Sequence, residues 1–369
     1  MKKLLLPIIC LLVIAIPCGA QWPRKDESYD QQWNLQERER NARKGEEPTG
    51  CDVTIYPSRS MNSGKGFSGG LAKVTLNNKA GFINRAGQLV IKARFDDAGR
   101  FSEGLAPVEI AGKWGYINKA GEVVIPLKFD WALGFYEGRA LIMVKDKWGY
   151  IDATGAVVVE PRFDEAGSFS EGVARVSIYD ENYKWGFIDR VGKYKWGFID
   201  KAGNWVLKPV YDSPVEDFYQ GRAPVSKDIG MNNGVVIDKF YIDIKGRSYP
   251  EPEPDERYED FDDINPFFEG LAAFRRDYKY GFVNRQANIV IAPQFEIAGF
   301  FSEGLAPVEI DKGQNYRGSW GYINRQGKLV IKSQFDWAWE FSEGRALVAV
   351  GHQVGYIDRT GRYIWKPSK

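Results

Sequence analysis

Glycines recur along this chain at fixed spacing, and this repetition constrains the fold more than any other feature. In an undisturbed unit the steps from Gly104 to Gly115, Gly121 and Gly138 are 11, 6 and 17 residues, which sum to 34. One series of glycines follows a Phe-x-Glu pattern: Gly70, Gly104, Gly138, Gly172, Gly221, Gly270, Gly304 and Gly344. A second follows an aromatic residue, usually Trp, in most units, and a third closes a turn six residues later. A fixed period of this length indicates a tandem repeat architecture rather than separate domains.

Each repeat is expected to contain three strands. In the unit after Gly104, these are residues 105–110, 113–118 and 122–125, each rich in aliphatic and aromatic residues. The second and third strands are joined by a turn that an Asn or Asp opens and a left-handed Gly closes. The opening residues are Asn84, Asn118, Asp152, Asp189, Asn284, Asn324 and Asp358. In the sixth unit Ala287 replaces the glycine, and we expect Asn288 beside it to take the left-handed conformation.

The segment from Phe129 to Phe135 is expected to cross to the next unit and to pack both aromatic rings between units. One three-stranded unit cannot bury its own face, so stacked neighbours supply the core. The sequence therefore predicts an all-β fold of about eight antiparallel β-meander repeats. A propeller-like ring is favoured because closure removes exposed strand edges, and an open β superhelix is the alternative.

Units such as FSEGLAPVEIAGKWGYINKAGEVVI resemble the bacterial WG-repeat family, also called KWG repeats. The resemblance extends over residues 67–365 and depends on the phased Trp-Gly and Glu-Gly pairs. It implies an all-β, propeller-like fold and a role in interaction rather than catalysis. The family brings no catalytic residues that could be transferred to this chain.

The N-terminus has the pattern of a secretory signal peptide. Lys2 and Lys3 precede an apolar stretch over residues 4–16, and small residues follow before Gln21, so cleavage is expected after Ala20. A lipid anchor on Cys18 is the disfavoured alternative because Pro17 precedes it directly. The expected organisation is a signal peptide (1–20), a polar tail (21–50), a first repeat block (51–249), an acidic Pro-rich loop (250–262) and a second block (263–369).

Charge and cysteine content exclude several classes of protein. Removing Lys2 and Lys3 leaves 48 basic residues against 49 acidic ones, which argues against nucleic acid as a partner. Cys51 is the one cysteine beyond the signal, so an intramolecular disulfide is not expected and the core must provide the stability. No transmembrane span is predicted in the mature part.

The carboxylate side chains, which are often catalytic in enzymes, recur here at fixed positions of the repeat and are expected to be structural. A carboxylate precedes the ladder glycine in most units, and such repeated groups are expected to accept hydrogen bonds from backbone amides at turns. Catalytic residues are normally singular, and His352, the one histidine, occupies a slot that lysine fills in other units. We therefore predict no catalytic residue, no cofactor and no metal site, and no enzyme activity.

Candidate contact residues are expected where the repeat pattern changes. Trp131 and Trp337 fill a slot that holds Asp or Glu in other units, which favours exposure, and Trp339 lies near Trp337 in sequence. Packing of these tryptophans against a neighbouring unit is the alternative. Repeated tryptophans such as Trp114 and Trp320 are expected to pack in the core instead.

Length varies at the hairpin between the first two strands, and inserted tips often form one binding face. The candidates there are Tyr179, Asn182, Asn232, Asn233, Tyr316 and Arg317. Residues 183–193 are almost repeated by 194–204, and one copy is expected to project as an extra hairpin or to replace the other.

These features favour an exported, non-catalytic protein that binds a protein or cell-envelope partner in the periplasm, at the cell surface or outside the cell. A glycan-binding protein that stacks sugars on Trp131, Trp337 and Trp339 is the alternative, and a hydrolase carries the least support. Glycan binding requires these tryptophans to lie in one accessible groove.

Overall fold

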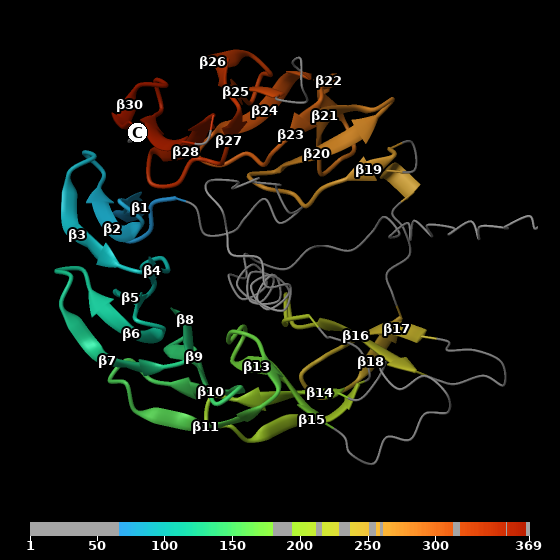
Figure 1. Ribbon diagram of the computed structural model, residues 1–369. Coiled ribbons are helices and arrows are strands. Elements are labelled where there is room, and N and C mark those ends of the chain that lie inside the picture. The colour runs from blue at the N-terminus through green and yellow to red at the C-terminus, as the bar shows by residue number, and fades with distance from the viewer. Residues whose placement is uncertain are drawn as a thin grey trace, which may run out of the picture.

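The structure is a computed structural model, and it describes residues 66–179, 194–211, 216–228, 237–250, 256–258, 261–312, 318–351 and 353–366. These residues form eight small antiparallel sheets that follow one another around a ring (Figure 1). The one helical element among them is a short 3-10 helix, η1 (Glu256–Tyr258). The fold is therefore an all-β tandem array, as the glycine spacing predicts.

We call the sheets units 1 to 8 in chain order. Units 1 and 5 have three strands (β1–β3 and β16–β18), and the other six have four (β4–β7, β8–β11, β12–β15, β19–β22, β23–β26 and β27–β30). In every unit the strands are hydrogen-bonded in sequence order. The last strand of each unit lies on the outside of the ring (Figure 1).

The strands fall into four sets. The innermost strands are β4 (Asp97–Ala98), β8 (Trp131–Tyr136), β12 (Glu165–Ala166), β19 (Asp263–Ile264), β23 (Ile297–Ala298) and β27 (Trp337–Ala338). The next set comprises β1 (Leu71–Leu76), β5 (Leu105–Ile110), β9 (Arg139–Val144), β13 (Val173–Tyr179), β16 (Ala223–Asp228), β20 (Leu271–Arg276), β24 (Leu305–Lys312) and β28 (Arg345–Val350). The third set comprises β2 (Lys79–Asn84), β6 (Lys113–Asn118), β10 (Lys147–Ile151), β14 (Tyr194–Asp200), β17 (Ile237–Ile242), β21 (Lys279–Asn284), β25 (Gly318–Asn324) and β29 (Gln353–Asp358). The outer strands are β3 (Leu89–Phe95), β7 (Val123–Phe129), β11 (Val157–Phe163), β15 (Trp205–Tyr211), β18 (Ser248–Pro250), β22 (Ile289–Phe295), β26 (Leu329–Phe335) and β30 (Tyr363–Trp365).

The turn between the third and outer strands has the expected mechanism. The Asn118 side-chain oxygen accepts hydrogen bonds from the amides of Ala120 and Glu122, each at 3.0 Å. Gly121 closes the turn with a φ of 82°. The expectation for the sixth unit is wrong, because Ala287 itself takes the left-handed conformation, with a φ of 61°. The Asn284 side chain holds that turn by the same two amide hydrogen bonds, which offset the strain at an alanine.

The Trp-Gly glycine sits where the outer strand is irregular. In unit 2 the pairing of β6 with β7 shifts register between Trp114 and Tyr116, so the outer strand bulges over Gly115. A Cβ on Gly115 would lie 2.5 Å from the Ile125 carbonyl oxygen. Unit 5 has Phe240 at this position, and its pairing with β18 shows no register shift. The glycine is therefore required by the bulge of the outer strand.

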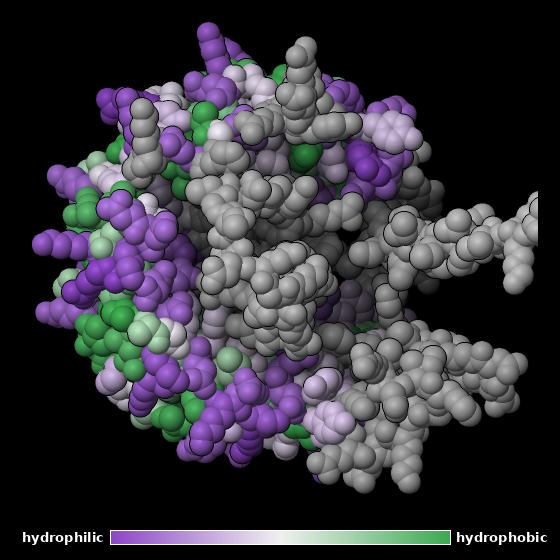
Figure 2. Space-filling model, in the orientation of Figure 1, coloured by the Kyte–Doolittle hydropathy of each residue, from purple (hydrophilic) through white to green (hydrophobic). Residues whose placement is uncertain are grey.

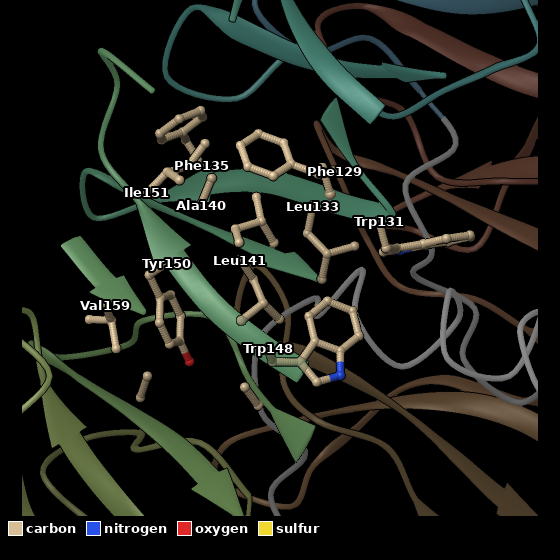
Figure 3. Packing of buried hydrophobic residues seen from close by; sticks show 14 of the residues in the cluster. Phe129, Trp131, Leu133, Phe135, Ala140, Leu141, Trp148, Tyr150, Ile151 and Val159 are labelled. Atoms are coloured by element: carbon tan, nitrogen blue, oxygen red, sulfur yellow. The ribbon is translucent and has the colours of Figure 1, made fainter. Parts of the chain in front are cut away.

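Aromatic rings fill the joints between units. Tyr116 of unit 2 packs edge-on against Phe135 of unit 3 with ring centroids 5.1 Å apart, and both are fully buried. Phe129 is buried in the same cluster (Figure 3), as expected for the crossing segment. The repeated tryptophans Trp114 and Trp320 are each 1% exposed, which confirms their place in the core.

The first and last units contact each other in the same way. Phe67, before β1, packs against Tyr356 of unit 8 with centroids 5.3 Å apart. The Tyr356 hydroxyl donates a hydrogen bond to the Lys73 carbonyl at 3.2 Å, and the Ser342 hydroxyl donates to the Phe67 carbonyl at 2.8 Å. The array therefore closes on itself between its first and last units, as a propeller-like ring requires.

Of the two nearly identical segments, the second forms the strand of unit 4 that pairs with β13. β14 (Tyr194–Asp200) pairs with β13 over seven residues, and Trp196 within it is 4% exposed. Residues 194–204 thus supply the strand and the turn of unit 4. The first copy, at residues 183–193, lies outside the described residues.

Candidate functional site

The glutamate of the Phe-x-Glu-Gly pattern joins six of the eight units to the next; unit 1 has Gly69 and unit 5 has Gln220 at this position. Glu137 of unit 3 accepts hydrogen bonds from the amides of Glu171 and Gly172 of unit 4, at 2.8 and 2.9 Å. The same contact recurs from Glu103 to Gly138, Glu171 to Gly221, Glu269 to Gly304, Glu303 to Gly344 and Glu343 to Gly70. We call this contact the glutamate clasp. The recurring carboxylates therefore serve the framework, as the sequence predicts.

The clasp stabilises a tight turn whose backbone is unfavourable for glutamate. Glu103 has a φ of 51° and Gly104 a φ of 90°, between two residues, Ser102 and Leu105, that exchange backbone hydrogen bonds. This is the two-residue turn that suits a twisted hairpin, and its first position usually holds Asn, Asp or Gly. The same turn recurs with a clasping glutamate in six of the units, so inter-unit bonding offsets the strain.

Basic residues complete several clasps. Arg85 of unit 1 donates two hydrogen bonds to Glu343, at 2.8 and 3.0 Å. Lys201 Nζ lies 3.1 Å from Glu137. Burial opposes ionisation of Glu343, but the hydrogen bonds from Arg85 and Gly70 outweigh it and lower the pKa of this carboxyl below its usual value. The clasp at the joint between units 8 and 1 is therefore ionised at neutral pH.

Replacing Glu343 by glutamine tests the pH dependence of this joint. A carboxyl whose pKa is lowered in the folded state stabilises it above the unfolded pKa of about 4.3, and this contribution is lost as the pH falls through the folded value. We expect E343Q to lower the melting temperature at pH 7 by about 2–4 °C. The difference from the parent protein should shrink as the pH falls below 4. The exposed Glu160→Gln variant serves as control, and a difference that is independent of pH would contradict the assignment.

A second set of carboxylates lies at the opposite ends of the strands. Asp96 accepts a hydrogen bond from the Ala111 amide at 2.7 Å, and Asp130 accepts one from Lys145 at the same distance. The Lys113 ammonium, with the Lys145 amide, holds the pKa of Asp130 below its usual value. These carboxylates fix the hairpins between β5 and β6 and between β9 and β10 of the following units, so they too are structural.

These contacts define two faces of the ring. The glutamate clasps and the turns around Asn118 lie on one face, which we call the clasp face. The hairpin tips at Ala111 and Lys145, with their aspartates, lie on the other, which we call the hairpin face. The hairpins that carry inserted residues join β13 to β14, β16 to β17 and β24 to β25, so all three open on the hairpin face.

Of the two tryptophans in the slot that was expected to face solvent, Trp131 is buried against a neighbouring unit, which was the alternative, and Trp339 near the other is buried as well. Trp131 is 8% exposed and packs against Trp114 of unit 2 with centroids 5.0 Å apart. It forms one edge of the cluster that has Phe135 at the other (Figure 3). Trp339 is also 8% exposed and lies in the cluster between units 8 and 1. Trp337 is partly exposed and packs against Trp320 at 4.6 Å.

The three tryptophans therefore do not lie together. Trp131 lies between units 2 and 3, whereas Trp337 packs against the clusters on both sides of unit 8 and contacts Trp339, with ring centroids 6.1 Å apart. They do not form the single accessible stacking platform that glycan binding on these residues requires. The physical reason is that a tryptophan at this slot folds over the tryptophan of the preceding unit, whereas Asp97 at the same slot reaches outward to Lys73 at 3.0 Å.

Exposed tyrosines mark the hairpin face. Tyr179 and Tyr194, at the paired ends of β13 and β14, are 44% and 40% exposed and form an edge-on pair at 5.6 Å. Tyr278, at the tip between β20 and β21, is 86% exposed. Asn182, Asn232, Asn233, Tyr316, Arg317 and His352 lie outside the described residues. Of the predicted hairpin contacts, Tyr179 is thus the one that the structure places, and it is accessible.

Small aliphatic patches occur on the outer rim. The first residues of several outer strands are more than one third exposed, among them Val90, Val123, Val124 and Val157. Figure 2 shows hydrophobic residues at the rim as small patches that alternate with hydrophilic ones. Their dispersion is typical of edge strands that are protected against pairing with another chain.

One polar cluster is not repeated and was missed by the sequence analysis. Arg175 stands where units 2 and 7 have Pro107 and Pro307, and its Nε lies 2.9 Å from Asp217 Oδ1. Burial raises the pKa of Glu165 and of Glu216, against the opposing charge of Arg175. The sequence feature that could have revealed this cluster is the arginine at a strand position where two other units have proline. The described residues contain no group of three His, Cys, Asp or Glu side chains arranged to hold a metal.

The chain is a member of a class of proteins built from tandem β-meander units arranged around a ring. A model of the WG containing repeat matches residues 81–114, 114–148, 148–183, 196–228, 260–280, 280–313 and 320–351. The chain therefore belongs to the WG-containing repeat family. Most of the matched segments begin at the Trp-Gly position or its equivalent, and they omit residues 184–195, in agreement with the use of the second copy in unit 4.

Comparison with solved structures gives only distant similarity. A structure described as a eukaryotic initiation factor is 13% identical, with a TM-score of 0.46, over 89% of this chain and 93% of that one. The dihydro-heme d1 dehydrogenase NirN is also 13% identical, with a TM-score of 0.43, over 86% and 77%. No curated protein matches the chain. The described residues include no helix with the length and apolar character needed to cross a membrane.

Proposed function

We propose that this chain is an exported, non-catalytic repeat protein that binds a protein or cell-envelope partner through its hairpin face. The main support for this proposal is that the repeated polar side chains bond within the framework of the protein. The clasp glutamates, the hairpin aspartates and the turn asparagines all bond to backbone amides of their own or a neighbouring unit. The polar side chains that recur most often therefore stabilise the fold.

The hairpin face supports this role because it combines accessible aromatic groups with variable length. Tyr179, Tyr194 and Tyr278 are exposed there, and tyrosine contributes large contact area at low entropic cost. Inserted residues occur at three hairpins on this face, and loops held by a rigid scaffold commonly carry binding. Among the described residues, the turns of the clasp face show no comparable variation in length, because they contact the next unit.

Site-specific photocrosslinking tests the proposal. A photoreactive phenylalanine analogue replaces Tyr278 or Tyr179 on the hairpin face, or Thr360 on the clasp face as the matched control. After irradiation in envelope extract of the producing cells, we expect one discrete crosslinked species from the hairpin positions and none from Thr360. Equal crosslinking from both faces, or none from either, contradicts the proposal. The Tyr179→Ser/Tyr194→Ser variant should reduce the yield from position 278.

Export is tested separately by the mature N-terminus. The signal-peptide pattern supports cleavage after Ala20, so N-terminal mass spectrometry of the exported protein should identify Gln21 as the first residue. Removal of residues 2–20 should keep the protein in the cytoplasm. An uncleaved chain in the exported fraction, or a lipid-modified Cys18, would overturn this part of the proposal.

A further inference from the structure

Seven of the eight joints in the ring contain the same aromatic pair. A Tyr or Phe from the third strand of one unit packs edge-on against the Phe of the Phe-x-Glu-Gly turn in the next unit, with centroids 4.8–5.3 Å apart. The pairs are Phe82–Phe101, Tyr116–Phe135, Tyr150–Phe169, Phe198–Phe218, Phe282–Phe301, Tyr322–Phe341 and Tyr356–Phe67. They include the joint between units 8 and 1, so chain connectivity is not required for the contact.

The joint between units 5 and 6 has a different partner for its phenylalanine. Phe267 is the turn aromatic of unit 6, and it packs against Tyr258 of η1 with centroids 6.1 Å apart. Tyr258 also packs against Phe261 at 5.9 Å. At the other joints, the turn phenylalanine packs against a ring of the preceding unit. In unit 6, Tyr258 of the linking segment takes the place of that ring.

The turn carbonyl of unit 6 is occupied in the same way. At two ordinary joints an arginine after the clasp glycine reaches the turn of the next unit: Arg139 donates to the Lys201 carbonyl at 3.2 Å, and Arg345 to the Arg85 carbonyl at 3.0 Å. The matching carbonyl in unit 6 is that of Arg285. It accepts from Arg257 at 3.2 Å and from the Tyr258 hydroxyl at 3.1 Å, both in η1. The matching arginine of unit 5, Arg222, lies over the Tyr249 ring of its own unit at 4.1 Å.

The glutamate clasp and the core change at the same joint. Gln220 stands in unit 5 where the clasp glutamate stands in six other units. The buried cluster on the unit 5 side extends from Val173 to Ile242, and the one on the unit 6 side from Phe261 to Val283. In the described residues these clusters have no member in common, whereas single clusters span both sides of the joint between units 8 and 1. The clasp glutamate is also absent from unit 1, which has Gly69, but the aromatic pair is replaced and the shared buried cluster is absent in the described residues only at the joint between units 5 and 6.

We propose that η1 is an internal cap that occupies, on unit 6, the surface that every other unit presents to its predecessor. The ring is then an arc of seven direct joints that runs from unit 6 through units 8 and 1 to unit 5. The first and last units are in contact within this arc, and its two ends are units 5 and 6. In the described residues, the junction between them has no aromatic pair and no glutamate clasp of the kind that joins the other units, so this is where the ring can open.

Distance measurements between spin labels test the opening. In a background with Cys10, Cys18 and Cys51 replaced by serine, one label pair is placed at Lys245→Cys and Gln286→Cys, on equivalent turns of units 5 and 6. The matched pair is Gln326→Cys and Thr360→Cys, on the same turns of units 7 and 8. We expect a broad distance distribution for the first pair and a narrow one for the second. Equally narrow distributions would overturn the proposal.

Hydrogen exchange tests the cap itself. The double variant Arg257→Ala/Tyr258→Ala removes the ring and both donors, and exchange in the turn at residues 284–288 and in β20 should become about tenfold faster. Exchange in units 7 and 8 should not change, which also shows that the variant is folded. Tyr258→Phe keeps the ring contact and should give a smaller effect confined to the turn. Unchanged exchange in unit 6 of the double variant would show that η1 is not a cap.

Discussion

Replacing Gly115 by alanine will destabilise the protein by about 3 kcal/mol or more, one of the largest single effects expected in this chain. A Cβ there lies 2.5 Å from the Ile125 carbonyl oxygen and 2.8 Å from both Leu127 N and Pro126 C. All three are backbone atoms of the bulged strand β7, so relief requires the strand to move. Because β7 also carries Phe129 into the joint with unit 3, we expect faster hydrogen exchange in units 2 and 3 and a lower melting temperature.

Gly112→Ala is the matched control for this prediction. Gly112 has a φ of 74°, and a Cβ on it meets nothing within 4 Å. The substitution therefore adds only the left-handed strain of about 1–2 kcal/mol. If Gly115→Ala costs no more than Gly112→Ala, the bulge is not the reason for the Trp-Gly glycine. Unit 5 gives a natural parallel, since Phe240 at this position coincides with a short outer strand that pairs without a register shift.

The parts of the fold that local chemistry determines could be predicted from the sequence. Two strands of unit 2 were expected at residues 105–110 and 113–118, and strands β5 and β6 have those bounds. The Asn118 turn and its left-handed Gly121 were likewise expected, because an Asx side chain and a glycine specify the turn without help from distant residues. The structural role of the clasp glutamates followed from their recurrence in nearly every unit.

The parts that depend on neighbouring units could not be predicted. Strand β4 is two residues long, too short for any periodicity to reveal it. Trp131 was expected to be exposed because its slot tolerates Asp and Glu, yet a large ring can fold onto Trp114 of the preceding unit where a carboxylate cannot. The partner of Glu137 is 34 residues away, and the spacing alone does not say whether such a side chain bonds within its own unit or to the next.

The altered joint between units 5 and 6 is a further example of a contact between units that the sequence alone does not predict. The acidic Pro-rich stretch at residues 250–262 was expected to be an exposed loop that separates two blocks. In its described part, Arg257 is exposed, and both Arg257 and Tyr258 contact the turn of unit 6. A single tyrosine in a polar segment has no periodicity, and its contact with Phe267 depends on where the ring places unit 6.

Truncating Phe135 to alanine will separate units 2 and 3 and cost about 3–5 kcal/mol. The side chain is 1% exposed, packs on the Tyr116 ring and lies in a cluster that also contains Trp114 and Tyr150. Units of a tandem array contact mainly their neighbours, so the loss should be local. We expect strongly increased hydrogen exchange in units 2 and 3 and little change in units 7 and 8.

Tyr116→Phe is the control that separates the ring contact from the hydrogen bond at this joint. It keeps the aromatic pair and removes only the hydroxyl that donates to the Leu133 carbonyl at 2.7 Å, at a cost of about 1–2 kcal/mol. A uniform rise of exchange in all eight units of Phe135→Ala would show that the closed joint between units 8 and 1 makes the ring unfold as one body. A local rise would show instead that the altered junction between units 5 and 6 leaves the array enough freedom to lose one joint at a time.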